Sequence, residues 1–328
     1  MLIEKLTGKT FLEVLAPVFK VIGVSDDIDC VKAPDGYRWG GSGVICSLRD
    51  FAKVGELLLN KGEYNGVQLI DRKYMEKATS KQISNLVNNE FVSSNNGYGY
   101  QIWITKHGYA MKGMGSQLAL CYPSKNFLFV CNADTQGCNF AAHMIIEKVD
   151  EMLFEKIQDT PLEKGEDFEK LKNRLKNLEI VKDFGTAHSK TEEKINGVKY
   201  RLRDGAMMGW KWFRFDFNGN KGLLTYENAR GIKKIAFGLG DYVLGTFPET
   251  HYSDWQVDTP ANRELDAIFI ANWKEEKQLL LRAYIIDKNI GNCFMNFSFK
   301  GDEVGLHFIK NAEFFLDDYS GFAGGEKE

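Results

Sequence analysis

The second half of the chain is a succession of short strand-forming segments, each ended by a polar turn. Turns such as Asn218-Gly219-Asn220 and Lys300-Gly301-Asp302 are short, so neighbouring segments must run antiparallel. Eight or nine strands joined in this way favour an up-and-down antiparallel barrel or a closed sandwich. The segments are residues 198–202, 210–217, 222–227, 233–239, 242–247, 265–273, 278–286, 293–299 and 305–309.

The first half combines helices with a shorter run of strands, which makes the whole chain an α+β protein. Residues 1–20 favour helix interrupted at Pro17, with Thr10 and Glu13 spaced as a capping box. Ser47 is a good N-cap for a second helix, which Gly62 stops. Later segments predict an antiparallel meander followed by an amphipathic helix. These segments are 98–105, 109–113, 117–122 and 127–131 for the strands and 139–157 for the helix.

A charged segment separates the two halves. Between residues 166 and 194, 14 of 29 residues are charged. Such a segment is typical of a solvated connector. The sequence therefore predicts a first domain over residues 1–158, a linker over 159–194 and a barrel domain over 195–328.

Composition excludes several classes of function. The chain has 42 Lys and Arg against 45 Asp and Glu, a net charge of −3, so nothing favours binding to nucleic acid. No apolar run is long enough to predict a membrane span. The six cysteines and five histidines are dispersed, which favours reduced thiols and predicts neither a metal site nor a cofactor. Without a signal segment, the chain as given is expected to be cytoplasmic.

Several short motifs follow one another in the first half. They are Trp39-Gly40-Gly41-Ser42-Gly43, the helix start at Ser47, Tyr64-Asn65-Gly66, Tyr98-Gly99-Tyr100-Gln101-Ile102-Trp103 and Lys112-Gly113-Met114-Gly115-Ser116-Gln117. In this order they resemble serine hydrolases related to class C β-lactamases and penicillin-binding proteins, over residues 3–155. The second half looks like the barrel domains attached to some of these hydrolases.

The resemblance implies a partial β-lactamase/transpeptidase-like antiparallel sheet with helices. It implies hydrolysis of an ester, amide or D-amino-acid peptide through an acyl-enzyme, with a small-molecule or peptide substrate. It places Lys112 and Gly113 at the third catalytic motif, although an alternative alignment puts Met111 there, and Lys112 could instead be an outward lysine on a strand. The implied substrate-binding residues are Tyr98, Tyr100, Ser116 and Gln117.

Two motifs of that family are missing from the chain. No serine is followed by lysine three residues later, so the acylating nucleophile is absent. Tyr226-Glu227-Asn228 matches Tyr-x-Asn, but its place in the strand-rich half indicates coincidence. The chain is therefore expected to be the C-terminal portion of a longer hydrolase, inactive alone. Its sheet would lack a covering layer and could self-associate through that exposed face.

The alternative is a non-catalytic module that binds a ligand or a partner chain on the barrel. The segment 210–217 alternates strictly, with Phe213 and Phe215 on one face and Trp210, Trp212 and Arg214 on the other. This pattern predicts a barrel strand with one face in the core. A second interpretation is a ligand surface built from the two indoles and Arg214.

Overall fold

The structure is a computed structural model of the 328-residue chain. It describes residues 2–32, 36–38, 43–85, 95–135, 138, 140–158, 160–161, 163–179, 185–203, 205–206, 209–249, 264–287, 291–311 and 320–328. The chain forms two compact units, Met1–Lys164 and Gly165–Glu328. Each unit is described by itself.

The first unit contains five α-helices, two 3-10 turns and eight short strands among its described residues. The helices are α1 (Leu2–Thr7), α2 (Phe11–Ile22), α3 (Leu48–Leu59), α4 (Arg72–Ala78) and α5 (Ala141–Leu153), with 3-10 turns at Pro123–Lys125 and Phe154–Lys156. The strands are β1 (Asp29–Cys30), β2 (Val44–Ile45), β3 (Glu63–Tyr64), β4 (Val67–Gln68), β5 (Trp103–Ile104), β6 (Tyr109–Gly113), β7 (Gln117–Tyr122) and β8 (Phe127–Cys131).

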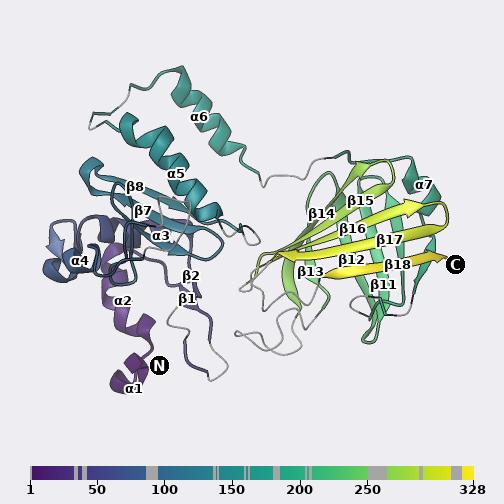
Figure 1. Ribbon diagram of the computed structural model, residues 1–328, viewed down its shortest axis with the longest axis horizontal. Coiled ribbons are helices and arrows are strands. Elements are labelled where there is room, and N and C mark those ends of the chain that lie inside the picture. Colours follow the sequence, from purple (N-terminus) through teal and green to yellow (C-terminus); the bar gives the residue numbers. More distant parts are fainter. Residues whose placement is uncertain are drawn as a thin grey trace. The chain divides into compact units, whose positions relative to one another are not determined.

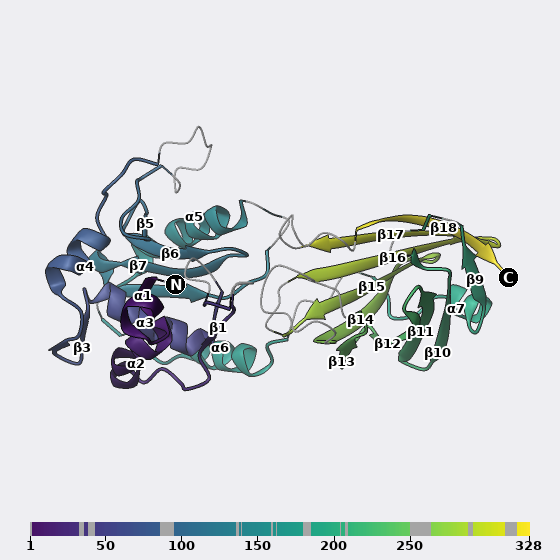
Figure 2. The same ribbon diagram turned by 90° about the horizontal axis from the view of Figure 1, so that it is seen from below.

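Strands β5, β6, β7 and β8 form the predicted antiparallel meander, in that order. The side chains of β7 alternate between two separate cores. Cys121 packs in one core with Leu58 of α3, and Leu120 packs in the other with Ile146 of α5. The two helices lie over opposite faces of the sheet (Figure 2).

This arrangement corrects the expectation of an exposed sheet face. From Leu118 to Tyr122 the strand β7 has no accessible surface on either side. The reason is that α3 and α5, both contributed by the chain itself, complete the two outer layers. Self-association through a bare sheet face therefore finds no basis in the described residues.

Local capping chemistry fixes the helix ends in the first unit. Thr10 and Glu13 form the predicted capping box, but α2 continues through Pro17 rather than breaking there. Ser47 caps α3 by accepting a hydrogen bond from the Asp50 amide at 3.1 Å. Gly62 ends the segment with φ +84°, a conformation that favours glycine.

The second unit holds two further helices and ten strands among its described residues. The helices are α6 (Glu166–Lys176) and α7 (Thr191–Ile195). The strands are β9 (Lys199–Leu202), β10 (Trp212–Asn218), β11 (Lys221–Asn228), β12 (Gly231–Leu239), β13 (Val243–Phe247), β14 (Leu265–Glu275), β15 (Gln278–Ile285), β16 (Asn292–Lys300), β17 (Glu303–Asn311) and β18 (Gly321–Lys327).

These ten strands form one sheet, in which the nine strands from β12 to β14 close on themselves and β13 flanks β14 (Figure 1). Each strand pairs antiparallel with its neighbours in the order β12-β11-β10-β9-β18-β17-β16-β15-β14-β13. A short parallel pairing of Gly238 with Ile270 and of Leu239 with Ala271 then joins β12 to β14. An α+β chain that contains an antiparallel barrel is confirmed.

Aromatic side chains fill the middle of the barrel. Phe213 and Phe215 of β10 point inward, and the ring centroid of Phe215 lies 4.9 Å from that of Phe297. Phe237 and Phe308 complete this layer from other strands. Phe213, Phe237, Phe297 and Phe308 have no accessible surface, and Phe215 is 1% exposed. A chamber would leave accessible surface on its walls, so the described interior is a packed core.

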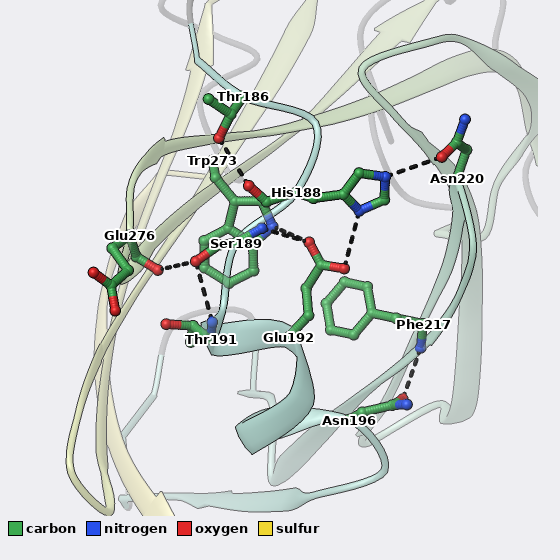
Figure 3. A network of polar contacts seen from close by, with 10 residues as sticks. All are labelled: Thr186, His188, Ser189, Thr191, Glu192, Asn196, Phe217, Asn220, Trp273 and Glu276. Atoms are coloured by element: carbon green, nitrogen blue, oxygen red, sulfur yellow. Dashed lines mark hydrogen bonds and ion pairs between the residues drawn. The ribbon is translucent and has the colours of Figure 1, made fainter.

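A network of polar contacts closes one end of the barrel, here called the helical end (Figure 3). Glu192 of α7 accepts a hydrogen bond from the Trp273 indole N–H at 2.8 Å and another from the Ser189 amide at 2.9 Å. Its second oxygen contacts His188 Nδ1 at 3.2 Å, and His188 Nε2 contacts Asn220 at 2.9 Å. The carboxylate thereby ties α7 to a core tryptophan and to the β10–β11 turn.

Phe215→Ala is expected to destabilise the barrel by about 3–5 kcal/mol, because it opens a cavity in the aromatic layer. Urea unfolding followed by tryptophan fluorescence measures the loss. Phe322→Ala is the matched control, since Phe322 is 73% exposed on the outer face, and it should cost less than about 1 kcal/mol. Equal losses in the two variants would contradict a filled interior.

His188 is expected to titrate above its ordinary range, because hydrogen bonds to Asn220 and to Glu192 raise the pKa of its imidazole. A raised pKa means that this contact stabilises the fold fully at low pH and that its contribution disappears as pH rises through the folded-state pKa. Glu192→Gln keeps an acceptor for Trp273 but removes the charge, so the pKa of His188 should fall. NMR titration of the His188 ring protons tests this, and an unchanged pKa in the variant would be the contrary result.

Candidate functional site

The structure brings only part of the predicted substrate-binding set together. Tyr98 bridges to Trp103, and their ring centroids lie 5.1 Å apart in an edge-to-face contact. Tyr100 is exposed and lies beside Tyr74 of α4, with 5.8 Å between ring centroids. The two predicted tyrosines therefore contact different neighbours.

Ser116 and Gln117 serve the turn that joins β6 to β7. Ser116 is buried, and its hydroxyl lies 2.6 Å from that of Thr135. The Gln117 amide donates to the Met114 and Gly115 carbonyls at 3.1 and 3.3 Å and also to the Ala133 carbonyl. Both side chains are engaged in holding local structure.

Lys112 lies near the end of β6 on the face that α5 covers, and Gly113 ends the strand. The Lys112 Nζ atom is 3.2 Å from Nε2 of His143 on α5 and 3.7 Å from the centroid of the Trp103 ring. Burial lowers the pKa of Lys112 to about 8. Burial, and then the charge of Lys112, lower the pKa of His143. The sequence did not indicate His143, although it shares a helical face with the buried Ile146.

The motif from Trp39 to Ser42 lies outside the described residues. The literal Tyr-x-Asn match is in the barrel, on β11, where Tyr226 and Asn228 both point inward. Their place on a barrel strand fits the interpretation of that match as a coincidence.

Buried polar side chains gather at the barrel end opposite α7, here called the polar end and defined by Trp210, Tyr226, Asn228, Glu249 and Lys310. The Tyr226 hydroxyl and the Asn228 amide both donate to Glu249 Oε1, at 2.6 and 2.8 Å. Glu249 is 1% exposed. A carboxylate this deeply buried needs such donors to offset its lost hydration.

Within the polar end, Trp210 lies on the inside of the barrel. Its ring stacks on Tyr226 with 3.8 Å between centroids and meets Phe308 edge-on at 5.1 Å. The indole is 4% exposed, yet its N–H has no acceptor among the described residues. An unpaired buried donor costs about 1–3 kcal/mol, so this atom is a place where a hydrogen-bond acceptor would bind favourably.

Trp210 and Trp212 do not share one face, which corrects the idea of a ligand surface built from both indoles and Arg214. Strand β10 begins at Trp212, so Trp210 precedes it and does not follow its alternation. The Trp212 N–H donates outside the core to Glu227 at 2.6 Å, and Arg214 pairs with Asp216 at 2.9 Å.

Lys310 brings a positive charge to the polar end. It lies opposite the core residue Cys293 in the β16–β17 register and is 4% exposed. Because paired residues point to the same side of a sheet, its stem lies on the inner face. The charge of Lys310 also acts on the Cys293 thiol, whose pKa burial raises to about 12.

Other kinds of site find no support in the described part of the chain. No three His, Cys, Asp or Glu side chains group there in a way that could hold a metal ion. No helix in that part is long and apolar enough to cross a membrane.

Comparison with known proteins gives no family model and no curated protein that matches the chain. Solved structures that match include a Schistosoma mansoni fatty acid-binding protein in complex with arachidonic acid, at 10% identity, with 42% of this chain and 98% of that chain covered and a TM-score of 0.31. A Manduca sexta fatty-acid-binding protein is 10% identical, with 41% and 98% covered and a TM-score of 0.28. Echinococcus granulosus fatty-acid-binding protein 1 is 16% identical, with 50% and 91% covered and a TM-score of 0.25.

These findings contradict the serine-hydrolase interpretation of the sequence. No family model or curated protein supports it, and the solved structures that match include the fatty-acid-binding proteins named above. The chain's assignment as a portion of a β-lactamase-related hydrolase is therefore wrong. The TM-scores are too low for the likeness to carry an argument about what this chain binds. The comparisons do not test the roles predicted for Lys112, Gly113, Tyr98, Tyr100, Ser116 and Gln117.

Removing the Glu249 acceptor is expected to destabilise the barrel. Glu249→Ala removes the carboxylate that accepts hydrogen bonds from the Tyr226 hydroxyl and the Asn228 amide. The free energy of unfolding should fall by roughly 2–4 kcal/mol. Glu249→Gln keeps one acceptor oxygen, so its loss of unfolding free energy should be less than half of the loss in Glu249→Ala. Urea unfolding of both variants measures the difference. If the two substitutions cost the same, the hydrogen bonds are not what holds this end of the barrel.

Proposed function

We propose that the barrel in Gly165–Glu328 is a non-catalytic binding module for a small ligand with an apolar aromatic body and a hydrogen-bond acceptor, held at the polar end. The observation that carries this proposal is the buried Trp210 N–H without an acceptor among the described residues. A ligand acceptor would pair this donor, and the Trp210 ring, which is 4% exposed, would contact the ligand body.

The filled interior limits the size of the ligand. Phe213, Phe237 and Phe297 occupy the barrel axis between the two ends, and the network around Glu192 closes the helical end. A long acyl chain lying along the axis would have to displace this layer, at several kcal/mol for each ring. A compact ligand at the polar end avoids that cost. Fatty acid binding belongs to the matched proteins by name, and the packing here favours a shorter molecule.

The indole N–H favours a strong hydrogen-bond acceptor on the ligand. The Glu249 oxygen that faces Tyr226 and Asn228 already accepts two hydrogen bonds. A carboxylate or sulfonate on the ligand would accept from the indole N–H.

8-Anilinonaphthalene-1-sulfonate has this chemistry and is the probe for a binding test with the full chain. Calorimetric titration should give saturable binding, which Trp210→Phe weakens by about tenfold because one buried hydrogen bond is lost. Trp212→Phe is the matched control and should leave the affinity unchanged, since that indole N–H already pairs with Glu227 outside the core.

Two results would reject the proposal. One is the absence of saturable binding to the wild-type chain. The other is an equal loss of affinity in the Trp210→Phe and Trp212→Phe variants, which would place the probe on the outer surface.

A further inference from the structure

Lys112 in the first unit is a partly buried amine with no carboxylate within ion-pair distance among the described residues. Lys53 of the same unit, by contrast, pairs with Asp50 at 3.0 Å. Lys112 instead has an imidazole, His143, and an indole ring, Trp103, as its neighbours. This is an unusual setting for a lysine, because a buried ammonium is normally neutralised.

The contact with His143 restricts how many protons the pair can hold. The Lys112 Nζ and His143 Nε2 atoms are 3.2 Å apart, so two positive charges would repel strongly across a partly dry space. At most one of the two groups carries a charge at neutral pH. The imidazole is then the neutral member of the pair, a base in direct contact with the amine that can receive its proton.

We propose that Lys112 is a nucleophilic amine that forms an imine with a small aldehyde or ketone. The nitrogen lone pair attacks the carbonyl carbon, and the carbonyl π electrons move to oxygen. His143 relays a proton from nitrogen to that oxygen, which gives a carbinolamine. Loss of water then gives the imine, with no change of oxidation state. The activity belongs to the first unit and does not depend on ligand binding by the barrel.

Lys61 provides an internal comparison. Its Nζ lies 4.2 Å from the centroid of the Tyr109 ring and 2.5 Å from the Thr79 hydroxyl, and burial lowers its pKa as well. It therefore shares the partly buried, ring-facing position of Lys112 but has a hydroxyl in place of the imidazole. A difference in reactivity between the two lysines isolates the contribution of His143.

The test is limited reductive alkylation of the full chain with acetaldehyde at neutral pH. Cyanoborohydride supplies the hydride that reduces the imine to a secondary amine, and peptide mass mapping locates it. Lys112 should be ethylated at least about tenfold faster than Lys61 and than Lys148, an exposed lysine paired with Glu151. His143→Gln should slow the ethylation of Lys112 severalfold and leave Lys61 unchanged, which also reports that the unit is folded.

The wild-type chain alone can overturn the proposal: it does so if Lys112 is ethylated no faster than Lys61 or Lys148. An unchanged rate at Lys112 in His143→Gln would also overturn it, because the base would then have no part in the reaction.

Discussion

The second unit depends on burial of aromatic side chains inside a sheet that closes on itself. Phe213 and Phe215 of β10 contact Phe297 of β16, a strand far away in the sequence, and closure through β12 and β14 encloses these rings. Closure pairs β12 with β14 and leaves β13 as an edge strand, and the packed rings provide much of the apolar burial. With the middle of the barrel filled, binding chemistry is confined to its ends. Glu192 ties the helical end to Trp273, and the ligand that we propose would bind at the polar end.

Much of this barrel could be predicted from the sequence, because alternation and short turns are local signals. Strand β18 was missed because Gly321-Phe322-Ala323-Gly324-Gly325 has little strand propensity, and pairing with β17 and β9 overrides it. Lys310 comes two residues after Phe308, so the same alternation could have placed it on the inner face of the barrel. The burial of Glu249 could not be predicted in this way, because its partners on β11 are distant in the sequence.

The first unit shows why the short motifs misled. Ser47 caps a helix, and Asn65 and Gly66 adopt positive φ angles of 48° and 80° in a tight turn. Gln117 holds a turn by donating to backbone carbonyls. These residues occur wherever the same local geometry is needed, so their order alone does not identify a family. Helix α5 was predicted correctly as a helix, and it buries His143 and Ile146.

The central claim is that aromatic packing separates a ligand-accepting polar end from a closed helical end. NMR of the 15N-labelled chain titrated with 8-anilinonaphthalene-1-sulfonate tests it through the indole N–H signals. The account predicts a shift for Trp210 and none for Trp273, whose N–H pairs with Glu192 beyond the aromatic layer. A shift of Trp273 with Trp210 unchanged would contradict it, because the probe would then occupy the part of the barrel that the structure fills with side chains.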